Sequence, residues 1–172
     1  MLLPALAQPA GVPLTRAAGT APATAATSPS TPPTSAPPKA AGIGTPVRDG
    51  KFQFTVASVT SAKSAGDSVL SQTAQGQCAV VYITVTNISN AAQTMDDSAQ
   101  YVYDSQGRKF FADSTADLYA NGTANSVFLN QINPGNSVHG LIYFDLPAND
   151  KAVSAQLHDS AFSGGVTVSL TH

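Results

Sequence analysis

The sequence contains no Trp, no Glu and a single Cys, and charged residues make up only 10% of its 172 residues. The single cysteine, Cys78, excludes an intrachain disulfide framework. The absence of Glu excludes a Glu-based catalytic acid. It also indicates a chain rich in strands and loops, because Asp, which supplies all ten acidic residues, favours turns and caps whereas Glu favours helices. No apolar run has the length that a membrane span requires.

Proline and aromatic residues are segregated along the chain. Ten of the 12 Pro residues precede Val47, and all 12 aromatic residues follow Gly50. Ala, Pro, Thr and Ser fill 32 of the first 46 positions, and such a segment buries too little apolar surface to offset the entropy cost of ordering it. We therefore predict a disordered, extended tether over residues 1–46 and one domain over residues 47–172.

The first seven residues resemble the end of a secretory signal, since Ala5-Leu6-Ala7 has the small-x-small pattern of a cleavage site. A cationic start and most of an apolar core are missing, so we expect either a true start upstream of Met1 or a trimmed chain. The alternative is a chance Ala-rich beginning. The first hypothesis predicts an exported protein, secreted or held on the extracellular face of the cell envelope.

The charge of the chain argues against polyanionic partners. The predicted domain carries six Lys or Arg and ten Asp, a net charge of −4, whereas the predicted tether carries +2. No basic stripe is present, which disfavours nucleic acid and anionic membranes as partners. We expect a monomer whose partner is an envelope or extracellular protein or glycan.

Short segments of alternating apolar and polar residues fill the predicted domain, a pattern typical of half-buried strands. The strongest is residues 77–88, in which four apolar side chains alternate with more polar ones. Further strands are predicted at residues 51–59, 101–103, 108–111, 127–132, 137–146, 152–158 and 166–170. Residues 61–77 offer few apolar anchors and are predicted to form a long mobile loop, and residues 117–125 are predicted to be irregular.

Two turn signals fit this series of strands. Asp104-Ser105-Gln106-Gly107 predicts a hairpin, because Asp can cap the bend and Gly tolerates a positive φ. Asn133-Pro134-Gly135 predicts a type II turn. Seven or more short strands without a helical period predict an all-β fold, an antiparallel immunoglobulin-like β-sandwich. A small β-barrel is the alternative.

Several of these features, in this order and spacing, resemble an uncharacterised family of exported bacterial domains. They are Gly44-Thr45-Pro46-Val47, Phe52-x-Phe54-x-Val56, Gly76-Gln77-Cys78-Ala79-Val80-Val81, Val85-Thr86-Asn87, Asp104-Ser105-Gln106-Gly107, Asn133-Pro134-Gly135, Phe144-Asp145-Leu146-Pro147 and Asp159-Ser160-x-Phe162. The family is similar to the telokin-like superfamily, named for its similarity to a secreted mycobacterial immunoprotective antigen. The resemblance covers nearly all of residues 43–170 and implies an immunoglobulin-like sandwich outside the cytoplasm. It implies no activity, and therefore no catalytic or binding residues.

Catalysis finds little support in the residues. Nucleophilic hydrolysis needs a Ser or Cys beside a His that a carboxylate orients, and only three His residues are present. By strand parity, His139 and His158 are predicted to point outward, and no Gly-x-Ser-x-Gly elbow exists. We expect no enzyme. The alternative is a small extracellular hydrolase that uses Asp and His.

Four aspartates are the candidate ligands for a hard cation such as calcium, namely Asp96, Asp97, Asp113 and Asp117. Neither the pair Asp96 and Asp97 nor the pair Asp113 and Asp117 follows the order of an EF-hand loop. We therefore expect solvated loop carboxylates and no metal or other cofactor. Cys78 is expected to be buried as a small apolar filler, the alternative being a reactive or dimer-forming thiol.

Four tyrosines, Tyr101, Tyr103, Tyr119 and Tyr143, are the candidate binding residues. A tyrosine offers apolar area and a hydroxyl, which suits contact with carbohydrate or protein. The alternative is that they form cross-strand pairs that stiffen a sheet. We predict a non-catalytic, tethered β-sandwich that binds a protein or an envelope glycan. The competing functions are the hydrolase and a structural spacer without a partner.

Overall fold

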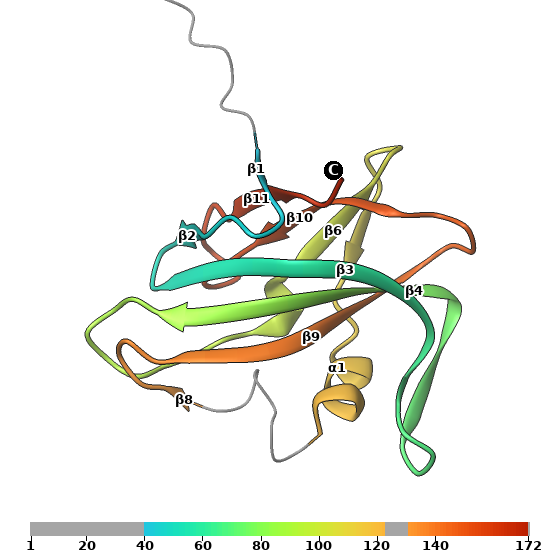
Figure 1. The fold of residues 1–172 in the computed structure, drawn as a ribbon, viewed down its shortest axis with the longest axis horizontal. Coiled ribbons are helices and arrows are strands. Elements are labelled where there is room, and N and C mark those ends of the chain that lie inside the picture. The colour runs from blue at the N-terminus through green and yellow to red at the C-terminus, as the bar shows by residue number, and fades with distance from the viewer. Residues whose placement is uncertain (1–39, 123–130, 172) are drawn as a thin grey trace, which may run out of the picture. The chain divides into compact units, whose positions relative to one another are not determined.

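Two stacked β-sheets and one short helix make up most of the structure, a computed structural model that describes residues 40–122 and 131–171 (Figure 1). The elements are β1 (Ala41–Gly42), β2 (Val47–Asp49), β3 (Phe52–Gly66), β4 (Ser71–Asn87), β5 (Gln93–Thr94), the 3₁₀ helix η1 (Asp97–Ala99), β6 (Tyr101–Asp104), β7 (Lys109–Phe111), α1 (Ser114–Asn121), β8 (Gln131–Ile132), β9 (Ser137–Leu146), β10 (Ala152–Leu157) and β11 (Val166–Ser169).

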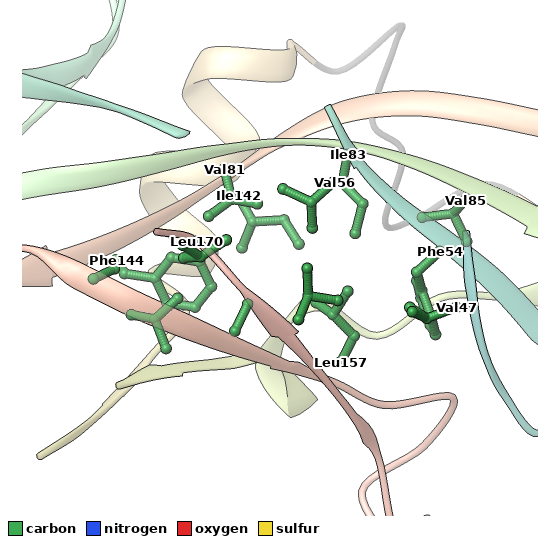
Figure 2. Close-up of a cluster of buried hydrophobic side chains, with 14 of the residues drawn as sticks. Val47, Phe54, Val56, Val81, Ile83, Val85, Ile142, Phe144, Leu157 and Leu170 are labelled. Carbon is green, nitrogen blue, oxygen red and sulfur yellow. The ribbon is translucent and has the colours of Figure 1, made fainter. Parts of the chain in front are cut away.

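The two main sheets enclose the hydrophobic core. One has the strand order β1-β11-β10-β6-β7 and the other the order β2-β3-β4-β9. Inward-facing side chains of both sheets meet between them, as Figure 2 shows for residues such as Phe54 of β3 and Leu157 of β10. Truncating a fully buried phenylalanine such as Phe54 to Ala is expected to cost about 3–5 kcal/mol of stability. The predicted antiparallel β-sandwich is therefore confirmed, with β1 and β11 as a parallel pair at one edge.

The predicted turns are also present. Asp104 Oδ1 accepts hydrogen bonds from the backbone N–H groups of Gln106 and Arg108, both at 2.9 Å, and β6 and β7 form the expected hairpin. In the second turn, Gly135 has a φ of 77°, as the third position of a type II turn requires.

The segment 61–77, predicted to be a mobile loop, consists instead of paired strands. β3 and β4 extend through it and meet at the pair Gly66 and Ser71. Asp67 closes the turn: its N–H donates to Leu70 O at 2.8 Å, and its Oδ1 accepts from Leu70 N at 2.9 Å. The ladder is held by backbone groups, which need no apolar side chains, so the scarcity of apolar anchors was a misleading signal.

Residues that precede the predicted boundary at residue 47 also take part in the five-stranded sheet. Ala41 and Gly42 of β1 pair with Val168 and Ser169 of β11, and the partly buried Ile43 packs on the core. A strand of two residues has no readable periodicity, and its partner lies at the other end of the chain. Residues 1–39 of the predicted tether, which include the signal-like start, lie outside the described residues, as do positions 127–130 of a predicted strand.

Helix α1 lies where the sequence was predicted to be irregular. Asp113 is its N-cap, and Asp113 Oδ1 accepts from the N–H groups of Thr115 and Ala116, both at 3.1 Å. Eight residues are too few to show a helical period. Among the residues described, no helix is long and apolar enough to cross a membrane.

The helix covers the outer face of the four-stranded sheet beside β9 (Figure 1). A second apolar cluster lies beneath the helix. The buried members of this outer cluster are Ala65, Cys78, Val80, Ala116 and Tyr143. Cys78 is only 3% exposed, which confirms its predicted burial. Helix α1 contributes Ala116 to the cover of this cluster.

Candidate binding face

Strand alternation places Tyr101 and Tyr103 on the outer face of the five-stranded sheet, since Val102 between them is fully buried. The β6–β7 hairpin sets Phe111 opposite Tyr101 and Lys109 opposite Tyr103. We refer to these four residues as the aromatic face. Two of the four predicted tyrosines are therefore brought together, with two partners that the sequence analysis did not single out.

The side chains of the aromatic face are in mutual contact. The rings of Tyr101 and Phe111 meet edge to face, with centroids 5.0 Å apart and an interplanar angle of 80°. Lys109 Nζ lies 4.1 Å from the centroid of the Tyr101 ring, and 5.7 Å and 5.8 Å from those of Tyr103 and Phe111. At an exposed site such a cation–π contact contributes about 0.5–1 kcal/mol. Phe111 remains 60% exposed.

Two polar side chains border this face, one on β10 and one just after its end. The Tyr103 hydroxyl donates a 2.9 Å hydrogen bond to Gln156 Oε1 across the β6–β10 pair. On the same border, the ring of His158 lies 4.9 Å from that of Tyr101. The face is thus an aromatic centre with an amide and an imidazole along one side.

His158 lies on the outer face, as strand parity predicted, since its ring is beside that of Tyr101, but it is buried there. It is 6% exposed, and its Nδ1 lies 3.2 Å from both the carbonyl oxygen and the hydroxyl of Ser163. The burial comes from the loop after β10, which folds back over the ring and which strand parity does not describe. The loop that covers it carries Phe162, which is 99% exposed.

The other two predicted tyrosines lie elsewhere. Tyr143 belongs to β9 of the other sheet, is 8% exposed and packs in the outer cluster under α1. Burial raises the pKa of its hydroxyl. Tyr119 is on α1 and partly exposed. The four tyrosines therefore do not form one surface, because strand parity gives the face of a strand without telling which sheet it joins.

The His residues of the alternative function, an Asp- and His-dependent hydrolase, do not meet a carboxylate within the residues that the structure describes. His139 is exposed on β9, where its Nδ1 is 2.8 Å from the hydroxyl of Thr84. In the described part of the chain, neither this imidazole nor that of His158 is hydrogen-bonded to a carboxylate. The carboxylate that would orient a catalytic imidazole is thus missing, in that part of the chain, at both His139 and His158.

Two of the four candidate metal ligands act as helix caps. Asp96 Oδ1 accepts from the N–H and the hydroxyl of Ser98, at 3.0 Å and 2.6 Å, at the start of η1, and Asp113 caps α1. Within residues 40–122 and 131–171, no three His, Cys or Asp side chains are placed to hold a metal ion.

The remaining two candidates are Asp97 of η1 and Asp117 of α1, and Asp97 contributes, after burial, to the raised pKa of Asp117. Asp117 is 1% exposed, and its Oδ1 accepts from Tyr143 N at 2.5 Å. Burial above all, and then the neighbouring Asp97, raises the pKa of Asp117 to about 9. Sequence reasoning placed these aspartates in two separate loops, and only the packing of η1 and α1 brings them together.

Comparisons with known proteins agree with this architecture. A family model described as "Domain of unknown function (DUF4352)" matches residues 41–167. Among solved structures, the secreted protein MPT63 of Mycobacterium tuberculosis has a TM-score of 0.56 at 15% identity, with 78% of this chain and 99% of that chain covered. The yjhA protein of Bacillus subtilis has a TM-score of 0.55 at 12% identity, with 76% and 99% covered. No curated protein sequence matches the chain.

At these identities the structural likeness concerns the fold alone. It confirms the immunoglobulin-like sandwich, and the family match confirms the resemblance drawn from the ordered sequence features.

Proposed function

The chain belongs to the DUF4352 family, whose function is unknown, and on that premise we propose that it is a non-catalytic β-sandwich module that binds an extracellular or envelope protein or glycan through the aromatic face. The observation that carries this proposal is the contact of Lys109 with three aromatic rings beside the largely exposed ring of Phe111. Exposed aromatic rings with a cation between them are groups that contribute strongly when a partner buries them.

The rigidity of the face supports the same function. Lys109 stands opposite Tyr103 and diagonal to Tyr101 on the paired strands, and Tyr103 is hydrogen-bonded to Gln156. Side chains that are already held in place lose less conformational entropy when a ligand binds. The fully exposed Phe162, in the loop that covers His158, offers a further apolar contact beside this face.

We further propose that the module works outside the cytoplasm, at the end of a tether. The Ala, Pro, Thr and Ser composition of the residues that precede β1 supports a spacer, and the similarity in fold to a secreted protein fits an exported domain. The aromatic face lies on the same sheet as β1, on the third and fourth strands from it.

The test is binding of the full chain to purified cell-wall sacculi and, separately, to immobilised envelope proteins, measured as a saturable isotherm. Phe111→Ser and Lys109→Gln are the informative variants, and each is expected to weaken binding about tenfold or more, as loss of a central interface residue does. Tyr82→Ser is the matched control, because Tyr82 is a 40% exposed aromatic on the other sheet.

Binding that survives both face variants but is lost in Tyr82→Ser would move the site to the other sheet. No saturable binding to either material would reject the proposed function. A hydrolase screen on the same preparations tests the alternative: turnover of an ester, peptide or glycan that disappears in a His139→Gln, His158→Gln double variant would show an enzyme.

A further inference from the structure

We propose that Asp117 is held in the folded protein as a neutral carboxylic acid that donates a hydrogen bond to the carboxylate of Asp97, and that this shared proton locks η1 and α1 onto strand β9. The proposal concerns a site remote from the aromatic face, and it does not rest on the proposed binding function.

The geometry of Asp117 requires a proton. Its Oδ1 accepts the Tyr143 N–H, whereas no donor group reaches Oδ2, which is buried. The side chain of Asp97 is near this carboxyl, since the segments that carry η1 and α1 meet at a 3.2 Å hydrogen bond from Ala112 N to Gln100 O. Two ionised carboxylates both accept hydrogen bonds and repel each other, so a stable contact between them needs one of them to be protonated.

The surroundings favour a proton on the buried member of the pair. The ionisable groups near Asp117 are Asp97 from η1, Asp113 at the start of its own helix, Tyr143 from β9 and Cys78 from β4. None of them supplies a positive charge, and none of the ion pairs within the described ranges includes Asp97 or Asp117. Ionising Asp117 would place an uncompensated charge in the outer cluster, whereas Asp97 is partly exposed to water.

The two hydrogen bonds of the Asp117 carboxyl join elements that are far apart in the sequence. Asp117 reaches from α1 to the backbone of Tyr143 through Oδ1, and through the proton on Oδ2 it reaches η1. Loss of the proton would convert the η1 contact into a repulsion and weaken the attachment of α1 over Cys78 and the rest of the outer cluster.

The expected pH dependence follows from the direction of the shift. The pKa of Asp117 is about 9 in the folded protein, and that of an unfolded Asp is about 3.9. Between these values the folded state holds one proton more than the unfolded state, so stability is greatest below the unfolded pKa and falls as the pH rises. For one full proton, the unfolding constant rises tenfold per pH unit across this window.

The direct experiment is a ¹³C NMR titration of the Asp117 side-chain carboxyl in the full chain. The carboxyl is expected to have the chemical shift of a neutral acid at pH 7 and to titrate well above pH 7. A midpoint near 4 would overturn the proposal. Because this measurement uses the unmodified protein, it remains decisive even if a variant fails to fold.

Urea unfolding between pH 5 and pH 9 provides the second readout. Asp117→Asn, in which an amide replaces the neutral acid and can donate to Asp97, is expected to fold and to lose the one-proton slope. Asp97→Asn offers an N–H to Asp117 and is expected to lower the pKa of that carboxyl. Asp96→Asn is the matched control, because Asn caps a helix as well as Asp does and Asp96 is not among the groups that shift the pKa of Asp117. A slope in Asp117→Asn equal to that of the natural chain would contradict the proposal.

Discussion

Asn121 of α1 and Leu141 of β9 are joined by two hydrogen bonds, in which Asn121 Nδ2 donates to Leu141 O and Leu141 N donates to Asn121 Oδ1, both at 2.9 Å. The side-chain amide thus takes the place of a neighbouring strand. Two residues further along β9, Asp117 Oδ1 and the N–H of Asp113 satisfy the N–H and C=O of Tyr143. The helix therefore covers an edge strand that would otherwise expose unpaired backbone groups.

Replacing Asn121 with Ala is expected to reduce the free energy of unfolding by about 1–3 kcal/mol, because the partly buried backbone groups of Leu141 lose both partners. Urea unfolding measures this change, and faster amide exchange at Leu141 would locate it. Ser114→Ala, at an exposed position of the same helix, serves as the control and should change stability by about 0.5 kcal/mol or less. An Asn121→Ala variant as stable as the control would show that water replaces the amide at no cost.

The two histidines are expected to respond differently to the same substitution. His158→Gln should destabilise the protein by about 1–3 kcal/mol, because it empties a buried ring site against Tyr101 and Ser163. His139→Gln removes one exposed contact with Thr84 and should cost about 0.5 kcal/mol or less. Thermal unfolding of the two variants side by side checks the difference, and equal effects would contradict the burial of His158.

Gly165 and Gly107 allow backbone strain to be separated from crowding. Both have a positive φ, 69° and 75°, so Ala is strained at either position by about 1–2 kcal/mol. At Gly165, however, a Cβ would also lie 2.8 Å from His158 Nδ1 and overlap the ring, whereas at Gly107 no atom lies within 4 Å.

Gly165→Ala is therefore expected to lose more stability than Gly107→Ala, and the excess should shrink when His158 is also changed to Ala. The measurement is the free energy of unfolding of four variants, namely Gly165→Ala, Gly107→Ala, His158→Ala and the double variant His158→Ala, Gly165→Ala. An equal loss at the two glycines would mean that the loop around residue 165 moves away without cost.

Cys78 is expected to be unreactive toward thiol reagents in the folded protein. Burial raises the pKa of its thiol to about 11, and the nearby carboxylates of Asp145 and Asp113 add to this effect. At pH 8 the reactive thiolate would then be about a thousandth of the population. A disulfide reagent should label it slowly at pH 8 and rapidly in urea, where the pKa returns to about 8.5. Rapid labelling of the folded chain would contradict this prediction.

The strand pattern of the domain could be predicted because it depends on neighbours in the sequence. The alternation in residues 137–146 gives the bounds of β9, and the hairpin at Asp104 and Gly107 follows from local turn chemistry. The alternation of apolar and polar residues does not predict an element that is very short or that contains few apolar residues. Helix α1 has eight residues, and the paired strands of segment 61–77 consist largely of small and polar residues.

The candidate sites were less accessible to sequence reasoning, since they consist of contacts between distant segments. Tyr101 and Tyr103 could be named from the sequence, but their contacts with Lys109 and His158 depend on strand order and on where β10 ends. Tyr143 has the same alternation as an exposed residue and is nevertheless buried, because α1 packs over its strand.

By itself, the sequence determined the division into a Pro-rich first segment and an aromatic-containing domain, the all-β class and the side chains of the core, because composition and a period of two act over a few residues. The tertiary structure alone decided which aromatic side chains share a face, where His158 is buried, and that Asp97 meets Asp117. These relationships arise when two sheets, a helix and a 3₁₀ turn pack together, and no pattern within one segment specifies which distant segment will lie against it.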